Sequence, residues 1–300
     1  MNSRLATAAL VLGTGVTFWA ARCTTVMDSR LLPEYEKYVA SAERIMETRF
    51  DAGDLAWVPP TGLKDAAAKL ASGKLVRWNL TDAALNQTLA DRNGAVIHWI
   101  GAVRVRHATL ADLNSVLEDS SQFVRVYHPM LFDCKPDAPF ECTNCRRDLI
   151  LGMQNSYRFA SLFPQHYAFQ VKARMEHGSV NGSGLRVRLS SAEIRESESG
   201  VPGRSDFLDQ YRDHGIMWAL NAYWRARQQG PDLYLEFESI TLARSAQAFV
   251  CKIGIVPVPK SIISAAMDSI PAESATVVLE GTRAECERRA RSGAPNASSR

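Results

Sequence analysis

Apolar and polar residues alternate most clearly over residues 214–244, HGIMWALNAYWRARQQGPDLYLEFESITLAR. One set of alternate positions is aromatic or aliphatic: Trp218, Leu220, Ala222, Trp224, Leu233, Leu235 and Phe237. The other set carries Asn221, Tyr223, Arg225, Glu236 and Glu238. Residues 228–232, with Gly230 followed by Pro231, have turn chemistry. A period of two predicts a long antiparallel hairpin with one buried face and one wet face.

Shorter alternating runs before this hairpin predict further strands. The cleanest are His166–Met175 and Leu185–Ile194, and others are expected at Ile97–Val105, Met130–Cys134 and Leu149–Phe159. Polar, glycine- and serine-rich connections separate the later runs. These short spacings favour an antiparallel sheet.

Helical periodicity appears near both ends of the chain. An amphipathic helix is predicted over Pro33–Phe50, followed by a second helix over Leu63–Leu70, whereas residues 74–93 have no clear pattern. The apolar positions of the first helix are Tyr35, Tyr38, Val39, Ala42, Ile45 and Met46. Thr109 and Asp112 form a capping box that opens a short helix, and a helical turn follows at residues 123–127. After the hairpin, we expect a short helix at residues 261–267 and a long helix from Pro271 that presents Ala275, Val278, Leu279, Thr282 and Cys286.

This order of elements predicts an α+β fold. A curved antiparallel sheet has an apolar concave face that must be covered, and one long C-terminal helix can cover it. Because the sheet curls, a cavity can remain between the sheet and the helix.

Five segments, in this order, resemble the START-like superfamily, also called SRPBCC or helix-grip. They are GAVIHWIGAVRVRHAT, LADLNSVLED, FVRVYHP, the hairpin with its Asn-x-Tyr-Trp-Arg, and SIPAESATVVLEGTRAE. The chain is most similar to a group of exported, uncharacterised bacterial proteins of that superfamily, over residues 32–289. The cysteine-bearing residues 133–147 depart from the pattern of that group.

The resemblance implies a helix-grip fold, with a curved sheet of about seven strands wrapped on the C-terminal helix. It implies a START-like domain over residues 94–290 and an N-terminal helical extension over 32–73. The small and polar residues 291–300 predict a disordered tail. It implies no particular reaction, because the superfamily includes binding proteins, transfer proteins and enzymes.

The N-terminal residues predict export. Arg4 precedes an uncharged, mostly apolar stretch from Leu5 to Ala21, so residues 1–23 are interpreted as a signal peptide or a membrane anchor. We therefore expect a protein that is periplasmic or anchored to the cell envelope, with membrane association through this segment as one alternative. The net charge of +3 is too small to require a nucleic-acid partner.

The cysteines suggest structural disulfides if the compartment is oxidising. Cys142 and Cys145 form a C-x-x-C with Cys134 eight residues upstream, and Cys251 and Cys286 are a second candidate pair. Free thiols, a zinc site and a redox centre are alternatives for the C-x-x-C. We expect no metal, because neither a second pair nor histidines at ligand spacing accompany it.

No catalytic signature is recognisable, and no cofactor is expected. The six histidines are scattered singly, and His128 and His214 are the best candidates for an acid or base. Arg225, Glu236 and Glu238 have two interpretations: a buried cluster that orients a polar ligand, or a cross-strand pair on the wet face. The alternation favours the second.

The leading functional hypothesis is a non-enzymatic binder of a hydrophobic or lipid-like molecule, held between the curved sheet and the C-terminal helix. Alternatives are a cyclase- or hydrolase-type enzyme with an acid/base residue in the same cavity, and a scaffold whose cavity is filled by its own side chains. The residues predicted to line the ligand site are Trp99, Tyr127, Phe169, Val171, Val187, Trp218, Leu220, Trp224, Leu235, Phe237 and Leu279.

Overall fold

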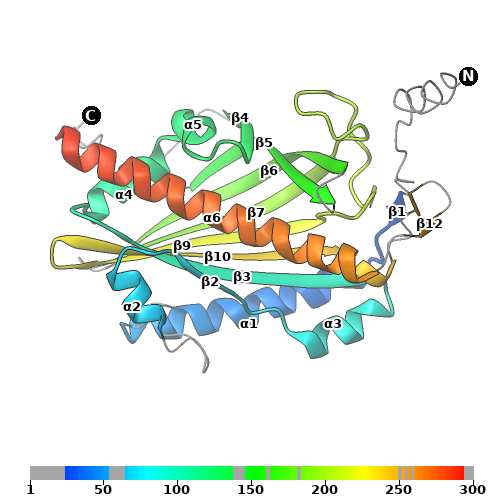
Figure 1. The fold of residues 1–300 in the computed structure, drawn as a ribbon, viewed down its shortest axis with the longest axis horizontal. Helices are drawn as coiled ribbons and strands as arrows, with labels where there is room; N and C mark the ends of the chain where they lie inside the picture. Colours follow the sequence, from blue (N-terminus) through cyan, green and yellow to red (C-terminus); the bar gives the residue numbers. More distant parts are fainter. Residues whose placement is uncertain are drawn as a thin grey trace, which may run out of the picture.

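A large antiparallel sheet forms the centre of the computed structural model (Figure 1). The structure describes residues 24–53, 65–137, 146–159, 163–180, 184–248, 252–253, 256–257 and 260–293. Eight strands lie in the spatial order β2-β3-β10-β9-β7-β6-β5-β4. Their bounds are β2 Val76–Asn79, β3 Gly94–Val105, β4 Leu131–Pro136, β5 Arg146–Phe159, β6 Phe163–Val180, β7 Gly184–Glu196, β9 Ala219–Gln229 and β10 Asp232–Arg244.

The predicted hairpin is confirmed. β9 and β10 pair in the expected antiparallel register, with Trp224 opposite Phe237 and Ala226 opposite Leu235. The sheet has one strand more than the predicted number of about seven. The additional strand, β2, comes from the stretch that shows no clear pattern in the sequence, and it pairs with β3 at the edge of the sheet. The domain bounds at residues 73 and 94 stay a prediction.

The C-terminal helix α6, Lys260–Ser292, crosses one face of the sheet (Figure 1). A Cβ atom added to Gly101 of β3 would lie 2.7 Å from Leu279 of α6, so strand and helix approach each other closely there. The sequence predicts two helices with a break near Pro271, and this is wrong, because α6 continues through the proline. Ala272 and Ala275, just after it, are buried, and their packing offsets the backbone hydrogen bond that the proline removes.

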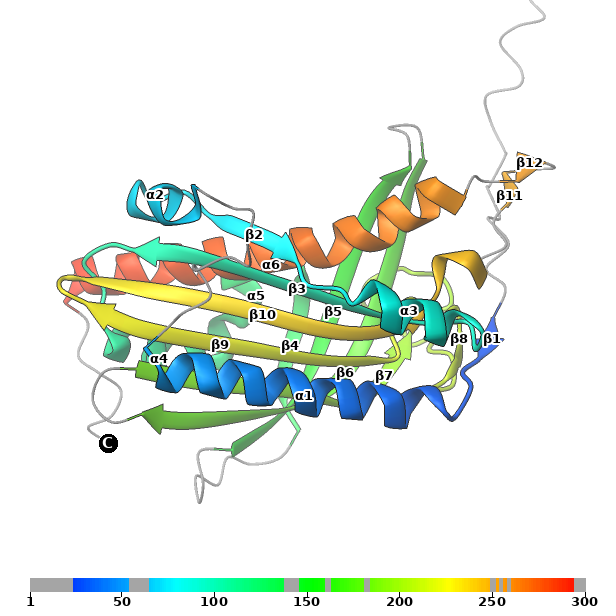
Figure 2. The same ribbon diagram turned by 90° about the horizontal axis from the view of Figure 1, so that it is seen from below.

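The N-terminal helix α1, Leu31–Asp51, lies on the opposite face of the sheet (Figure 2). The predicted amphipathic helix is confirmed, except that Ile45 is 58% exposed and lies outside the buried stripe. Tyr35 donates a hydrogen bond to the carbonyl of Ile240 at 2.8 Å, and Tyr223 donates to Glu43 at 2.8 Å. The face predicted to be wet is therefore covered by a helix.

Short elements complete the described part of the chain. The helices are α2 Ala66–Ala71, α3 Ala83–Ala90, α4 Leu110–Glu118 and α5 Phe123–Val126, with 3-10 turns η1 Ser120–Gln122 and η2 Ala246–Ala248. The strands β1 Thr25–Val26 and β8 Arg212–Asp213 form one small pair, and β11 Lys252–Ile253 and β12 Val256–Pro257 form another. The capping box of Thr109 and Asp112 at the start of α4 is confirmed.

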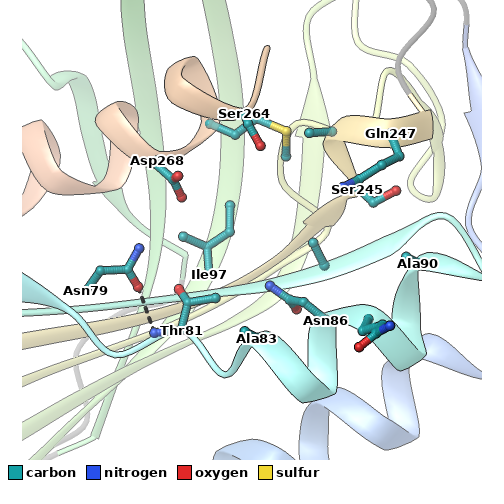
Figure 3. Close-up of a pocket in the computed structure, with 14 residues that line it drawn as sticks. Asn79, Thr81, Ala83, Asn86, Ala90, Ile97, Ser245, Gln247, Ser264 and Asp268 are labelled. Carbon is teal, nitrogen blue, oxygen red and sulfur yellow. Dashed lines mark hydrogen bonds between the residues drawn. The ribbon is translucent and has the colours of Figure 1, made fainter. Parts of the chain in front are cut away.

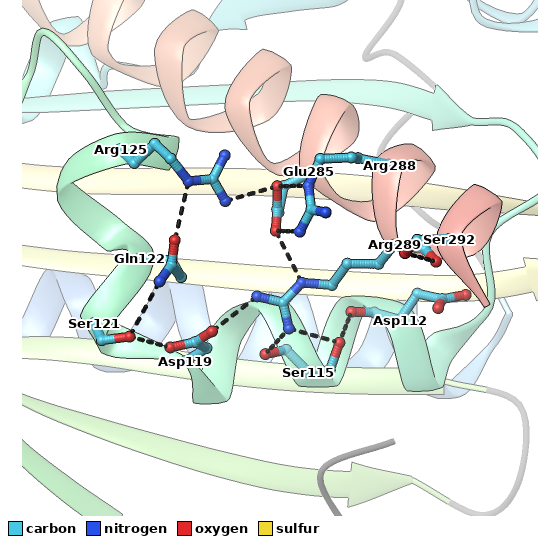
Figure 4. A network of polar contacts seen from close by, with 10 residues as sticks. All are labelled: Asp112, Ser115, Asp119, Ser121, Gln122, Arg125, Glu285, Arg288, Arg289 and Ser292. Atoms are coloured by element: carbon cyan, nitrogen blue, oxygen red, sulfur yellow. Dashed lines mark hydrogen bonds and ion pairs between the residues drawn. The ribbon is translucent and has the colours of Figure 1, made fainter. Parts of the chain in front are cut away.

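A buried carboxylate ties α6 to α4 and α5 (Figure 4). Glu285, 3% exposed, accepts hydrogen bonds from Arg288 and Arg289 of the same helix and pairs with Arg125 of α5 at 2.9 Å. These contacts lower the pKa of Glu285 to about 2, with the hydrogen bond from Arg288 as the largest cause. Arg289 also pairs with Asp119, which follows α4, at 3.0 Å. The network fixes the C-terminal half of α6 over this end of the sheet.

The expected disulfide between Cys251 and Cys286 is not formed, because Cys286 is unpaired. Its side chain is fully buried in the core beneath α6, and this burial raises its pKa. Cys134 is also unpaired, and burial raises its pKa to about 11. Cys142, Cys145, Cys251 and the predicted export segment lie outside the described residues. Within the described ranges, no helix is both long and apolar enough to cross a membrane.

Candidate functional site: a pocket between the sheet edge and the C-terminal helix

A pocket of about 570 Å³ lies between the β2–β3 edge of the sheet and the N-terminal half of α6 (Figure 3). The helix α3 and the turn η2 form its other walls. Small and polar side chains line most of it: Asn79, Thr81, Ala83, Asn86, Gln87, Ala90, Ala95, Ile97, Ser245, Ala246, Gln247, Ser264, Met267 and Asp268. Ligand pockets of 300–1,000 Å³ are typical for small molecules.

Alternation along β3 decides which of its side chains reach this pocket. Gly101 faces α6, and Ile97 and Ala95 occupy positions of the same parity on the same strand. Val96 has the opposite parity and packs in the cluster beneath α1. Ile97 and Ala95 therefore form an apolar floor on the face of the sheet that α6 covers.

Local hydrogen bonds hold α3 against this floor. The carboxylate of Asp82 caps α3 by accepting from the backbone N–H groups of Ala84 and Leu85. Asn86 accepts from the backbone N–H of Val96 at 2.7 Å and donates to the carbonyl of the same residue at 2.9 Å. This two-point contact anchors α3 to β3 and places the wall of the pocket independently of any ligand.

Ser245 and Asp268 are two polar groups of the lining without a hydrogen-bond partner among the described residues. Ser245 is 2% exposed, and its Oγ is buried without a hydrogen bond. Asp268 of α6 is the one charged side chain among the lining residues; it is exposed at the pocket rim, and partial burial of its carboxyl raises its pKa above the ordinary value. Because an unsatisfied buried polar atom costs about 1–3 kcal/mol, the Ser245 hydroxyl indicates a site for an additional polar group.

Most of the predicted site residues lie together on the face that α6 covers, away from the pocket lining. Eight of them are members of one packed hydrophobic cluster, against which Leu220 also packs. The eight are Tyr127, Phe169, Val171, Val187, Trp224, Leu235, Phe237 and Leu279. Trp224 and Phe237 stack edge-on, with ring centroids 5.0 Å apart. That these side chains contact a ligand stays a prediction.

Among the predicted site residues, Trp99 is the one best placed to contact a ligand in the pocket. It shares the parity of Ile97, one alternate position farther along β3, and pairs with Asn79 of the pocket lining across the β2–β3 ladder. It is partly buried, and its indole N–H is buried without a hydrogen-bond partner in the described part of the chain. A ligand that extends from the pocket along β3 would meet this side chain.

Trp218 does not lie on the face that α6 covers, and this part of the prediction is wrong. It packs in the cluster beneath α1, and its indole N–H donates to Asp213 at 2.8 Å. The regular strand begins at Ala219, and the chain turns just before it, at Gly215 with a φ of 79°. The alternation of the hairpin therefore does not extend to Trp218.

Arg225, Glu236 and Glu238 are also buried, at 4%, 2% and 1% exposure, so their assignment to a wet face is wrong. The alternation places them correctly on the face opposite Trp224, but α1 covers that face. Arg225 forms ion pairs with both glutamates. Glu238 also pairs with Arg49 of α1 and accepts from His98 Nε2 at 2.7 Å. We call these five side chains the buried ion cluster.

The charges of the buried ion cluster are paired within the cluster, although the Nε atoms of Arg225 and Arg49 have no hydrogen-bond partner among the described residues. Tyr38 of α1 lies 2.8 Å from His98 Nδ1, so the two ring nitrogens of His98 both have partners. Two arginines face two glutamates, and no charge is left over for a ligand. Within the described residues, no group of three or more His, Cys, Asp or Glu side chains could hold a metal ion.

The two histidines considered as acid or base candidates lie apart from the pocket lining. His128 is exposed. His214 is buried and its Nδ1 lies 3.0 Å from Glu196 Oε1. Beside this pair, Asp213 accepts from Gly215 N–H and Trp218 Nε1–H through Oδ1, and its Oδ2 has no partner among the described residues. Burial, with the charge of Glu196, raises the pKa of Asp213 to about 6.

Replacing Asp213 with asparagine is expected to change how stability depends on pH. The carboxyl group titrates near 3.8 in the unfolded chain and near 6 in the folded chain. Its contribution to stability is therefore complete below about pH 4 and is lost as pH rises through about 6. The free energy of unfolding of Asp213→Asn, minus that of the original protein, should therefore rise by up to about 3 kcal/mol between pH 4 and pH 7.5. Urea unfolding at both pH values measures this difference.

The exposed Asp209 gives the matched control, because Asp209→Asn should leave the pH dependence unchanged. A parallel pH dependence for the Asp213→Asn variant and the original protein would contradict the assignment of the raised pKa to Asp213.

Comparison with solved structures reveals several of similar fold. The Zhui aromatase/cyclase from Streptomyces sp. R1128 is 14% identical, with a TM-score of 0.43 over 66% of this chain and 98% of that one. A STAR-related lipid transfer protein from Xanthomonas axonopodis is 12% identical, with a TM-score of 0.42 over 70% and 98%. A START superfamily protein from Mycobacterium smegmatis is 10% identical, with a TM-score of 0.37 over 64% and 97%. No family model and no curated protein matches the sequence.

The architecture itself confirms the predicted α+β fold class. The open antiparallel sheet, the long C-terminal helix across one face and the N-terminal helix agree with a helix-grip fold. At these identities and TM-scores, the likeness carries no argument about a ligand or a reaction. The function must be argued from the pocket.

Proposed function

We propose that this protein binds a small amphipathic molecule between β3 and the N-terminal half of α6. The pocket of about 570 Å³, with its apolar floor and polar rim, carries the proposal. Ile97 and Met267 offer apolar surface from the sheet and the helix. Each buried CH₂ group of a ligand would contribute about 0.8 kcal/mol, so a short chain suffices for binding.

The polar lining supports binding more than catalysis. The lining residues include one carboxylate, Asp268, and no histidine, cysteine, lysine or arginine. A nucleophile activated by a neighbouring base needs two such groups within hydrogen-bond reach, and the pocket lining does not supply them. Amide and hydroxyl groups at its rim suit orientation of a ligand.

The proposal places this binding in the cell envelope. The support is the N-terminal sequence, in which Arg4 precedes the apolar stretch from Leu5 to Ala21. Whether that segment is cleaved or retained as an anchor is part of the test. Fractionation with N-terminal sequencing should find the mature chain outside the cytoplasm, and a cytoplasmic chain beginning at Met1 would contradict export.

Native mass spectrometry of protein purified from its own envelope tests the binding proposal. We expect a co-purifying small molecule on the original protein and its loss from Ala95→Phe, which fills the floor of the pocket. Met267→Trp fills it from the helix side and guards against a folding defect in the first variant. Ala84→Phe is the matched control, because Ala84 is exposed on α3 and outside the lining.

An unchanged bound mass on both filled variants would contradict the proposed site. No bound molecule on the original protein, together with no binding in a panel of single-chain amphiphiles, would favour a scaffold filled by its own side chains.

A further inference from the structure

The pocket lining carries a negative charge and no positive one. Asp268 is the one charged group among its 14 residues. Figure 3 shows its carboxylate extending from α6 toward the space above Thr81 and Ile97. No ion pair or hydrogen bond joins Asp268 to another described residue, and the partial burial of this largely exposed carboxyl raises its pKa. The pocket therefore has a negative group without a cation.

The neutral polar groups of the lining offer acceptors beside the donors of their amide and hydroxyl groups, so the charge of Asp268 is what makes the lining one-sided. Asn86 uses both its amide N–H and its oxygen on the backbone of Val96. The hydroxyl oxygen of Thr81 accepts from the backbone N–H of His98 at 3.0 Å, and Asn79 Oδ1 accepts from the backbone N–H of Thr81 at 2.7 Å. Their remaining lone pairs, the free Ser245 Oγ and the Asp268 carboxylate all accept hydrogen bonds.

A ligand head group that donates several hydrogen bonds and carries a positive charge complements this lining. A protonated amine has both properties, and hydrogen bonds between ionised partners are about twice as strong as neutral ones. An anionic head group would instead lie against Asp268 with no arginine or lysine of the lining to balance it.

We propose that the pocket selects an amphipathic amine, with the ammonium group at Asp268 and the aliphatic part on Ile97 and Met267 toward Trp99. This inference rests on the proposed binding function and names the chemical class of its ligand. Asp268 acts here as the determinant of specificity for the head group.

Isothermal titration with three single-chain probes of one length, decylamine, decanol and decyl sulfate, tests this inference below their micelle concentrations. On the original protein we expect decylamine to bind at least tenfold more tightly than the other two. Asp268→Asn should weaken decylamine binding about tenfold and leave decanol binding unchanged. Because Asp268 is exposed at the pocket rim, this variant is expected to fold normally.

Glu273→Gln is the matched control, since Glu273 is an exposed carboxylate of α6 outside the pocket lining. It should retain the preference for the amine. Equal binding of all three probes that is lost in Ala95→Phe would overturn the inference while the binding function stands. A preference for the amine that survives Asp268→Asn would also overturn it. Failure of all three probes to bind the original protein would count against the binding function itself.

Discussion

Replacing Arg225 with methionine should destabilise the protein by about 3–5 kcal/mol. Arg225 is the central cation of the buried ion cluster, between Glu236 and Glu238. Its removal leaves two carboxylates at 2% and 1% exposure with one partly exposed arginine, Arg49, nearby. Urea unfolding at neutral pH measures the loss, and the midpoint should fall with little change in the slope.

Two further variants make this prediction specific. Arg204→Met removes an exposed arginine and should change stability by less than about 0.5 kcal/mol. Adding Glu236→Gln and Glu238→Gln to Arg225→Met should recover part of the loss, because the uncompensated charges are then removed. A cost for Arg225→Met no larger than that of Arg204→Met would show that α1 does not cover this face.

Replacing Phe237 with alanine should cost about 3–5 kcal/mol of stability. Phe237 is 4% exposed, and it packs on Trp224 in the cluster beneath α6. The loss combines the transfer of its ring from water with the cavity that remains. Ile45→Ala, at a 58% exposed position of α1, is the control and should have little effect.

The same variant tests whether a ligand binds in the packed core or in the pocket. Phe237 is outside the pocket lining, so folded Phe237→Ala should keep its affinity for a pocket ligand. A specific loss of ligand affinity at unchanged fold would place the ligand among the residues predicted from the sequence instead.

The sequence predicts the sheet and its hairpin well because alternation has a period of two, and burial on one face makes that period visible. It predicts α1 and α4 because an amphipathic stripe and a capping box are local signals. It does not show which surface an amphipathic helix covers. The alternation therefore predicts that the polar positions of β9 and β10 face solvent, although α1 buries them.

The pocket could not be predicted from any single stretch. Its walls come from residues 79–90, 95–97, 245–247 and 264–268, which are far apart in the sequence. Small and polar residues such as Asn79, Thr81 and Ser245 are common in turns and loops, and no pattern distinguishes them. Trp99 is the exception, because it lies two positions from Ile97, on the same face of a strand that the sequence predicts clearly.

Methyl-resolved NMR titration with decylamine tests the central claim most directly. We expect shifts confined to the methyl groups of the pocket, on Ala95, Ile97, Ala246 and Met267. The methyl groups of Val187, Leu235 and Leu279 in the packed cluster should stay unchanged. Shifts confined to that cluster, or no shifts at saturating probe, would contradict a binding site between β3 and the N-terminal half of α6.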